Sequence, residues 1–397
     1  MNIFYVPSWY PDPRRQIMNG VFLYEAVTSL AKHHPSLRIY VSLWGQGDRE
    51  LSAARFRTWL GHPGLGDRSR RGRHQVAANL VELHSPTWTW RYTVRRGNIA
   101  AVLRRNRSHL AEAKAECGRI DLIHAQVSFP AGYVAMCLAA EHRIPFAVSE
   151  HMSPFPFRHF ERHGAVVADV AEPLRRARCV TAVSRALAGE IRAKIGVEAV
   201  VLPNGVDETF FTPAPRTPQG FTFLTVANLE HQKGIDDLLQ AIALVGPLSG
   251  VRYRLAGRGS RGGAYRALAG RLGVQDRVEW LGQLGRTEVR DAMRECDCFV
   301  LTSRHESFGV VYAEATACGK PVIATRCGGP EDIVHDGNGV LVPVGDVAGI
   351  ARALTTMVGR AREYDAGAIR ADFESRFASR SVSQRLVALY HELAGVC

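Results

Sequence analysis

Two glutamates separated by eight residues, Glu306 and Glu314, are the pair of side chains in this sequence best placed to do chemistry. Glu306 lies just after a predicted apolar strand, and Glu314 lies inside the helix that the pattern predicts from about residue 308. Eight residues at helical rise span at most roughly 12 Å, about the separation between the hexose and the ribose of a nucleoside diphosphate sugar. We therefore expect Glu306 to bind sugar hydroxyls and Glu314 to bind the ribose diol.

The start of that helix offers a second feature suited to an anionic or sugar ligand. The backbone N–H groups of Phe308, Gly309 and Val310 lie in the first turn, where the helix itself supplies no acceptor. Glu314 also lies among apolar helix residues, where a carboxylate without a partner is costly. The alternative is that Glu306 only caps the helix and that Glu314 lies on the surface.

Lys233 is one of only five lysines, and it lies where a cation could bind a diphosphate. It follows the predicted strand at residues 221–227 and stands at the start of the next helix. An ammonium in that place would stabilise the negative charge of a departing diphosphate. Taken alone, the same lysine could be an ordinary exposed residue at a helix start.

Several ordered segments of the chain resemble those of the GT-B glycosyltransferases of family 4, the retaining group 1 enzymes. The similarity is nearly continuous from Glu306 to Asp346, and it extends to VANLEHQKGIDDLLQAI at 226–242 and PNGVD at 203–207. Two N-terminal segments, SWYPDPRRQIMNGVF and SEHMSPF, are also similar to family segments, less closely. The resemblance implies two Rossmann-like domains that face a cleft, and a nucleotide-sugar substrate.

The resemblance also implies roles for individual residues. Gly20 would let the backbone close on the diphosphate, and His151, which follows a predicted strand, would contact the donor sugar or the transition state. Asn228 stands where family members usually have an arginine, so we expect Arg258 to help neutralise the phosphates. The expected catalytic residues are Glu306, His151 and Lys233. The expected donor-binding residues are Gly20, Asn228, Lys233, Arg258, Glu306, Phe308, Gly309, Val310 and Glu314.

Apolar strands alternate with helices twice along the chain, which indicates an α/β fold with two doubly wound parallel sheets. The predicted strands lie at residues 2–7, 38–43, 79–84, 121–125, 145–149 and 179–183, and again at 221–227, 252–256, 278–280, 298–301 and 322–324. A proline cluster after the NGVD turn indicates a linker. The predicted organisation is an acceptor-side domain at 1–205, a linker at 206–220, a nucleotide-sugar domain at 221–375, and a terminal helix at 376–397 that, as in GT-B proteins, crosses back to the first domain.

Basic residues are concentrated in the N-terminal half. Residues 1–200 contain 28 Lys and Arg against 16 Asp and Glu, a net charge of +12, whereas residues 201–397 contain 22 of each. The densest basic segments, 68–73 and 88–107, suit an anionic partner such as membrane phospholipid, a polyprenyl diphosphate or nucleic acid. The alternative is an ordinary solvated face. We expect a lipid surface or lipid-linked acceptor and no nucleic acid, with these residues taking part: Arg70, Arg71, Trp88, Trp90, Arg95 and Arg96.

Together these features predict a retaining hexosyltransferase that uses a UDP- or GDP-sugar and a glycan acceptor, lipid-linked, in bacterial surface polysaccharide biosynthesis. The sequence has no Asp-x-Asp motif, so we expect no metal at the diphosphate, and no cofactor. No apolar stretch is long enough to cross a bilayer and the N-terminus lacks a cationic leader, so we expect a cytoplasmic protein peripheral on the inner face of the plasma membrane.

Three alternatives remain open at the level of sequence. A nucleotide-sugar epimerase shares the GT-B architecture but needs no acceptor. A glycogen-type phosphorylase would need pyridoxal phosphate on a lysine, and five lysines leave it little choice. A non-catalytic nucleotide-sugar-binding or membrane-scaffold protein would not need the set of Glu306, Glu314 and Lys233.

Overall fold

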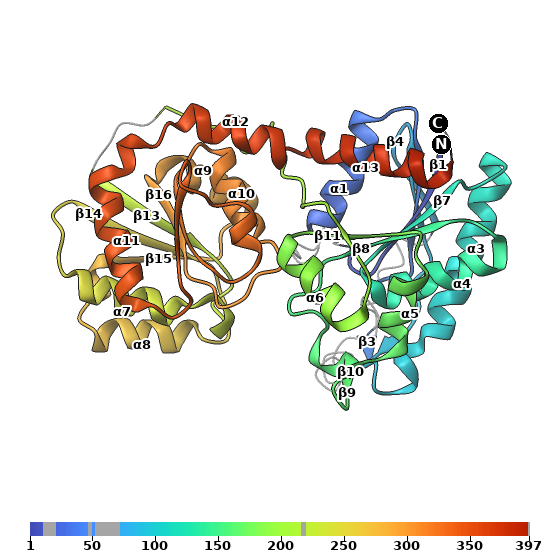
Figure 1. The fold of residues 1–397 in the computed structure, drawn as a ribbon, viewed down its shortest axis with the longest axis horizontal. Helices are drawn as coiled ribbons and strands as arrows, with labels where there is room; N and C mark the ends of the chain where they lie inside the picture. The colour runs from blue at the N-terminus through green and yellow to red at the C-terminus, as the bar shows by residue number, and fades with distance from the viewer. Residues whose placement is uncertain (11–20, 47–49, 52–71, 216–219, 396–397) are drawn as a thin grey trace. The chain divides into compact units, whose positions relative to one another are not determined.

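The chain forms two compact units, each built around its own sheet (Figure 1). The computed structural model describes residues 1–10, 21–46, 50–51, 72–215 and 220–395. The N-terminal unit comprises residues 1–183, 187–202 and 383–397, and the C-terminal unit comprises residues 184–186 and 203–382. The chain therefore passes from one unit to the other after residue 202, whereas the sequence predicted a division after residue 205.

The N-terminal unit contains a mixed sheet of eight strands with the order β12-β11-β8-β7-β1-β2-β5-β4. These strands are β1 (Asn2–Pro7), β2 (Arg38–Leu43), β4 (Gly72–Ala77), β5 (Leu80–His84), β7 (Leu122–Gln126), β8 (Phe146–Glu150), β11 (Cys179–Ala182) and β12 (Val200–Val201). Two short pairs lie outside it, β3 (Glu50–Leu51) with β6 (Thr89–Trp90) and β9 (Glu161–Arg162) with β10 (Ala165–Val166). Its helices are α1 (Val21–His33), α3 (Ile99–Cys117), α4 (Tyr133–His142), α5 (Ala168–Arg176), α6 (Arg185–Ile195) and α13 (Ser379–Ala394).

Helices cover both faces of this sheet, as a parallel sheet requires. Residues of α1 and the end of α13 share one apolar cluster with the central strands, including Val27, Tyr390 and Ile3. Figure 1 shows α3 and α4 lying along the other side of the sheet from α1. The strand β4 departs from the predicted parallel pattern, because it pairs antiparallel with β5 at the sheet edge and is exposed along most of its length. An edge strand without a buried face shows no apolar periodicity in the sequence.

The C-terminal unit contains a parallel sheet of six strands with the order β15-β14-β13-β16-β17-β18. The strands are β13 (Phe221–Val226), β14 (Val251–Ala256), β15 (Val278–Gly282), β16 (Cys298–Leu301), β17 (Val322–Thr325) and β18 (Gly339–Val342). The helices are α7 (Ile235–Val245), α8 (Gly262–Arg271), α9 (Arg286–Glu295), α10 (Val310–Ala317), α11 (Val347–Arg360) and α12 (Ala366–Arg376). Figure 1 shows α7, α8 and α11 on one side of this sheet and α9, α10 and α12 on the other.

In each sheet the strand order reverses once. The chain runs from β13 outward through β14 to β15 and then returns to the other side of β13 as β16. In the N-terminal unit it runs from β1 through β2 toward β5 and returns to the other side of β1 as β7. Ligands of open α/β sheets bind at the carboxyl ends of the strands that flank such a reversal. The loops after β13 and β16, and those after β1 and β7, are therefore the places to look for a site.

Candidate functional site

The loops that follow β13 and β16 bring Lys233 and Glu306 together at the strand reversal of the C-terminal unit. Lys233 ends the short helix η6 (His231–Lys233), and its Nζ donates to Oε1 of Glu306 at 2.6 Å. The side chain of Lys233 is 22% exposed and that of Glu306 is 9% exposed. A largely enclosed ion pair thus lies where this class of sheet binds ligands.

The carboxylate of Glu306 is held in one orientation by its surroundings. Its Oε1 also accepts a hydrogen bond from Oγ of Ser303 at 2.7 Å. Its main chain bridges to the neighbouring loop, because its N–H donates to the carbonyl of Cys327 at 3.1 Å and its carbonyl accepts from the N–H of Gly329 at 2.7 Å. Within the described part of the chain, no hydrogen bond engages Oε2 of Glu306, so this oxygen is able to accept from a ligand hydroxyl.

Arg304 joins the two loops, and the sequence reasoning missed it. Its guanidinium donates to both carboxylate oxygens of Asp237 at 2.8 Å and to those of Asp236 at 2.9 and 3.0 Å. It also donates to the carbonyl of His231 at 2.7 Å, while its own N–H donates to the carbonyl of Gln232 at 2.7 Å. An arginine two residues before the key glutamate, together with an acidic pair just after Lys233, is the sequence signal that could have indicated this contact.

Gly234 allows the same two loops to approach each other closely. Its φ is +61°, and a Cβ at this position would lie 1.9 Å from the carbonyl oxygen of Thr302. The hydroxyl of Thr302 in turn donates to the carbonyl of Gly234 at 2.8 Å. A side chain here would force the loops apart, so the glycine is required for the position of Lys233 beside Glu306.

Helix α10 begins beside Glu306 and carries Glu314. Gly309, with a φ of +84°, forms its N-cap, and no hydrogen bond among the described residues engages the N–H groups of Phe308, Gly309 or Val310. Burial raises the pKa of Glu314 to about 7, although the positive charge of Arg286 acts in the opposite direction. The helix start can therefore receive hydrogen-bond acceptors, and Glu314 is a carboxylate that can change its protonation near neutral pH.

Asn228 and Arg258 lie at the carboxyl ends of two adjacent strands, β13 and β14. Their loops are joined by a hydrogen bond from the N–H of Leu229 to the carbonyl of Arg258 at 3.0 Å. A Cβ on Gly257 would lie 1.8 Å from the carbonyl oxygen of Ala227, so the two loops are in backbone contact. Both side chains are exposed at this edge. The geometry permits Arg258 to act beside Asn228, and the role itself stays a prediction.

In the N-terminal unit, a buried chain of hydrogen bonds connects His151 to the last helix. Oε1 of Gln126 lies 2.6 Å from Nε2 of His151, and Nε2 of Gln126 lies 3.2 Å from Nε2 of His124. Nδ1 of His124 lies 2.5 Å from the hydroxyl of Tyr390 in α13. His124 is therefore an internal link of this chain.

The proton positions of His124 and His151 are linked through Gln126. Burial lowers the pKa of His124 to about 3, so His124 is neutral and has one N–H. If Gln126 donates its amide to Nε2 of His124, then His124 donates from Nδ1 to Tyr390, and the amide oxygen of Gln126 accepts from Nε2–H of His151. Gln126 is the last residue of the reversal strand β7 and was not singled out in the sequence.

Glu150, next to His151, has a structural role. Its carboxylate accepts from the backbone N–H groups of Ser128 at 3.0 Å, His151 at 2.8 Å and Met152 at 2.9 Å. These three bonds tie the loop after β8 to the loop after β7 and hold the backbone of His151.

Two family models together match most of the chain. Residues 26–210 match the model described as Glycosyltransferase Family 4, and residues 207–365 match the model described as Glycosyl transferases group 1. The chain is 30% identical over 322 residues to a D-inositol 3-phosphate glycosyltransferase of Thermobifida fusca, covering 72% of this chain and 73% of that protein. The chain belongs to the group 1 glycosyltransferases.

Other relatives of this glycosyltransferase match over shorter spans. It is 31% identical over 232 residues to an uncharacterised glycosyltransferase of Methanocaldococcus jannaschii, covering 56% of this chain and 61% of that protein. It is 36% identical over 136 residues to a lipopolysaccharide core biosynthesis glycosyltransferase of Rhizobium meliloti, covering 34% of this chain and 38% of that protein. The chain thus spans less than two thirds of the length of either relative.

A solved structure confirms the predicted fold of the glycosyltransferase. HepE from Anabaena, crystallised in complex with UDP-glucose, superposes with a TM-score of 0.67 at 21% identity, covering 99% of this chain and 100% of that chain. The predicted GT-B fold, an α/β architecture of two Rossmann-like domains, is therefore confirmed.

The residues predicted for the acceptor side of the glycosyltransferase differ in their surroundings. Arg70 and Arg71 lie outside the described residues, as does Gly20, which was predicted to bind the donor. Trp88 is exposed, whereas Trp90 is half-buried and donates from its indole N–H to the carbonyl of Val94 at 2.7 Å. Arg96 forms an ion pair with Asp169, while Arg95 has no ion pair with any described residue. Of these side chains, Trp88, Arg95 and Arg96 are exposed, and Arg96 is engaged by Asp169.

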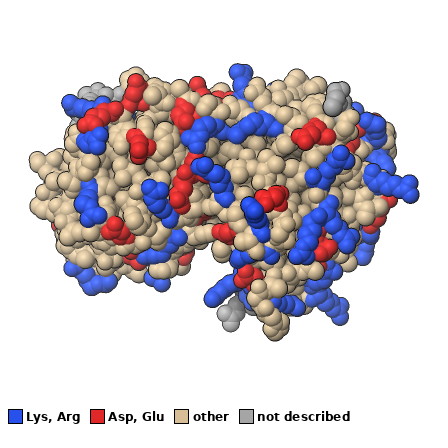
Figure 2. Space-filling model, in the orientation of Figure 1, with Lys and Arg blue, Asp and Glu red and all other residues tan. Residues whose placement is uncertain are grey.

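The basic excess is visible on the surface of the N-terminal unit. Figure 2 shows more Lys and Arg than Asp and Glu side chains on the visible face of that unit. Among the described residues, every helix is too short or too polar to cross a lipid bilayer.

Proposed function

We propose that this enzyme transfers a hexose from a UDP- or GDP-sugar to a lipid-linked glycan acceptor, with retention of the anomeric configuration, in bacterial surface polysaccharide biosynthesis. The observation that carries the proposal is the pairing of Lys233 with Glu306 at the strand reversal of the C-terminal unit. A cation and a carboxylate in contact at this place match the two parts of the donor that meet at the reacting bond, the diphosphate and the sugar.

The donor would bind along the carboxyl edge of the C-terminal sheet. The ammonium of Lys233 and the first N–H groups of α10 would bind the diphosphate, because both present positive charge or donors to an anion. Oε2 of Glu306 would accept from sugar hydroxyls, and Glu314 would accept from the ribose diol. The complex of HepE with UDP-glucose supports a nucleotide sugar as the donor.

The chemical step we propose needs no carboxylate nucleophile. The bond between the anomeric carbon and the diphosphate oxygen breaks, and the acceptor oxygen bonds to that carbon from the same face. The proton of the acceptor hydroxyl moves to the departing phosphate oxygen. Lys233 would stabilise the charge that develops on the diphosphate, which addresses the difficult part of the reaction. His151 is the residue of the N-terminal unit that we propose to contact the sugar, held by Gln126 at 2.6 Å.

The acceptor and the location are proposed from the charge of the chain. The N-terminal half carries the whole net charge of +12, which favours docking on an anionic membrane surface from the cytoplasmic side. The relative from Rhizobium meliloti, named for lipopolysaccharide core biosynthesis, supports a lipid-linked glycan as the acceptor.

A donor panel with an acceptor arm tests the proposal. UDP-, GDP- and ADP-sugars are incubated with the enzyme, and nucleotide release is measured with and without lipid-linked glycans. We expect one donor to be used, acceptor to stimulate release, and the anomeric proton of the product to show retention by NMR. Glu306→Gln should abolish transfer, whereas Glu295→Gln, at a side chain that is 65% exposed, is the matched control and should not change it.

Other outcomes would replace this proposal. A new free sugar formed without any acceptor would identify an epimerase. Binding of nucleotide sugar without release or transfer, across the whole panel and with acceptors present, would identify a non-catalytic binding protein. An inverted product would leave the transferase assignment in place and remove the retaining mechanism.

A further inference from the structure

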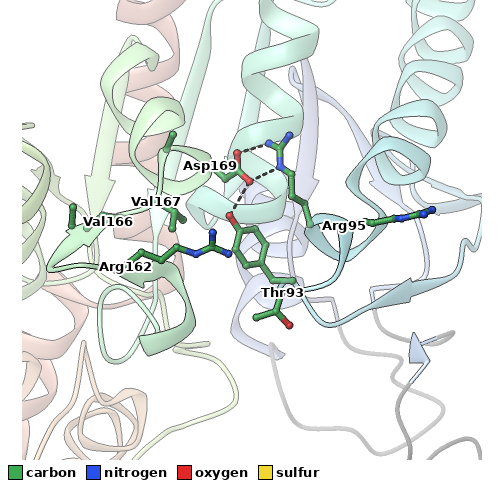
Figure 3. Close-up of a pocket in the computed structure, with 10 residues that line it drawn as sticks. Thr93, Arg95, Arg162, Val166, Val167 and Asp169 are labelled. Carbon is green, nitrogen blue, oxygen red and sulfur yellow. Dashed lines mark hydrogen bonds and ion pairs between the residues drawn. The ribbon is translucent and has the colours of Figure 1, made fainter.

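A pocket in the N-terminal unit lies apart from every residue given a role above except Arg95 and Arg96. It has a volume of about 600 Å³ and is formed by the segment before α3 and by the segment from β9 to the start of α5. Its lining residues are Tyr92, Thr93, Arg95, Arg96, Arg162, Ala165, Val166, Val167, Ala168 and Asp169 (Figure 3). The three arginines and one aspartate give this lining, which we call the arginine pocket, a formal charge of +2.

The single acidic group of the arginine pocket is already occupied. The carboxylate of Asp169 accepts from Nε of Arg96 at 2.5 Å, from a second nitrogen of Arg96, and from the hydroxyl of Tyr92 at 2.9 Å. The guanidinium of Arg96 also lies 4.5 Å from the ring centroid of Tyr133. Arg96 therefore has an ion-pair partner within the protein while its side chain stays 43% exposed, and its contact with a membrane stays a prediction.

Arg162 is the cation that remains for a ligand. It forms no ion pair with any described residue, and it is exposed. Figure 3 shows its side chain pointing in toward Asp169, whereas Arg95 extends away from Asp169 at the other rim. A cation that points into a pocket whose only carboxylate is already paired creates a place for an anion.

The backbone beneath Arg95 and Arg96 is held in an unusual conformation. Four successive residues, from Arg95 to Asn98, have positive φ values of 41, 54, 67 and 68°, and three of them are not glycine. The turn is fixed by Arg96 on Asp169 and by Nδ2 of Asn98, which donates to the carbonyl of Trp88 at 2.7 Å. Such strain persists where the surroundings enforce it, and it gathers at binding sites.

Apolar surface continues from the arginine pocket. Four small or aliphatic residues, at 165–168, form part of its lining. Val94, between the lining residues Thr93 and Arg95, is 55% exposed, and Trp88, whose carbonyl accepts from Asn98, is 42% exposed; these are two of the few large apolar side chains exposed in the described chain. A site with an unpaired guanidinium pointing into it and an apolar continuation fits an anion that is attached to an aliphatic chain.

We propose that the arginine pocket binds the phosphoryl group of a lipid phosphate, with Arg162 on the phosphate and Val94, Trp88 and residues 165–168 along the first part of the chain. The inference rests on the proposed transfer to a lipid-linked acceptor, since it assigns the place where that acceptor is anchored. The pocket also adjoins the loop that starts at His151, because Tyr92 packs against Phe160 of that loop at 4.9 Å between ring centroids.

Titration calorimetry with the full-length enzyme tests the proposal. The probes are farnesyl phosphate, farnesol and inorganic phosphate, each at low salt. We expect farnesyl phosphate to bind more tightly than either of the others, because it alone has both a phosphate group and an aliphatic chain. Arg162→Gln should weaken its binding on the order of ten- to a hundredfold, as for loss of a charge-assisted contact. Arg162→Lys keeps the charge but not the planar guanidinium, so its affinity for farnesyl phosphate should lie between those of the wild type and Arg162→Gln.

Arg158→Gln is the matched control, because Arg158 is exposed, lies four residues from Arg162, and does not line the pocket. It removes the same charge and should change the affinity less than twofold. Equal losses in the two glutamine variants would show general attraction to a basic surface and overturn the pocket. Inorganic phosphate that binds as tightly as farnesyl phosphate would overturn the lipid part. A wild-type enzyme that binds UDP but not farnesyl phosphate refutes this inference alone, whereas one that does not bind any nucleotide refutes the proposed function.

Discussion

Replacing Lys233 by methionine removes a charge while keeping most of the side-chain volume, and it tests the donor site directly. We expect kcat for nucleotide release to fall by about 10²–10³, because one preorganised charge contact at a reacting centre contributes about 3–4 kcal/mol. The variant also leaves the carboxylate of Glu306, which is 9% exposed, without its cation at 2.6 Å. Since the pair is neither fully buried nor exposed, we expect this to lower the free energy of unfolding by about 2 kcal/mol.

A double-mutant cycle with Glu306→Gln separates these two effects. Glu306→Gln removes the charge that Lys233→Met leaves unpaired. The loss of unfolding free energy in the double variant, measured by urea unfolding, should therefore be smaller than the sum of the two single losses by about 1–2 kcal/mol. Lys320→Met is the control for loss of a lysine charge, because Lys320 donates to the carbonyl of Arg294 at 2.7 Å, and it should leave kcat unchanged. Additive losses in stability, or a Lys233→Met enzyme with kcat within threefold of the wild type, would refute the pairing of Lys233 and Glu306 as the centre of the site.

Four further predictions address other parts of the enzyme. Because burial raises the pKa of Glu314 to about 7 and the ribose hydroxyls would donate to its ionised form, UDP affinity measured by calorimetry should increase as pH rises through 7, and Glu314→Gln should remove this dependence. Tyr390→Phe removes the hydroxyl partner of Nδ1 of the buried His124, so it should lower the unfolding free energy by about 1–3 kcal/mol and reduce kcat while UDP affinity stays constant; an unchanged kcat would show that this contact does not act on His151. Gly234→Ala places a methyl group 1.9 Å from a carbonyl oxygen and should impair both folding and turnover, whereas Gly270→Ala, in the helix α8 with open space around it, should stabilise by about 0.5–1 kcal/mol. Activity should persist in EDTA, and a strict requirement for a divalent metal would contradict the proposed role of Lys233.

The sequence predicted the site best where the residues concerned lie within one short segment. Glu306, Glu314 and the start of α10 lie within one segment, and their order along a strand, loop and helix predicts their neighbourhood without knowledge of the rest of the fold. Strands β16 and β17 of the C-terminal sheet are buried along their whole length, so their apolar runs predicted them closely. Strand β4 escaped prediction because it is an exposed edge strand, and the short strand β18 also went unpredicted.

Contacts between distant segments escaped the sequence for a different reason. Arg304 lies 68 residues from Asp236, and His124 lies 266 residues from Tyr390, so neither pair forms a local pattern. Arg96 also has a distant partner that the sequence did not predict. Its place in an arginine-rich stretch predicts an exposed cation, which it is, but does not show that Asp169, in another element, forms an ion pair with it.

The sequence by itself determined the fold class, the family resemblance and the identity of the charged residues at the donor site, because these depend on residue type and spacing within single elements. Only the tertiary structure decided which of those charges meet. The order β14-β13-β16 places the loops of Lys233 and Glu306 side by side, and the close approach at Gly234 brings their side chains to 2.6 Å. The same holds for Arg162, which is available to a ligand because Asp169 is already paired with Arg96. The physical reason is that the energy of a charge depends on its partners and its exposure to water, and both are set by segments far apart in the chain.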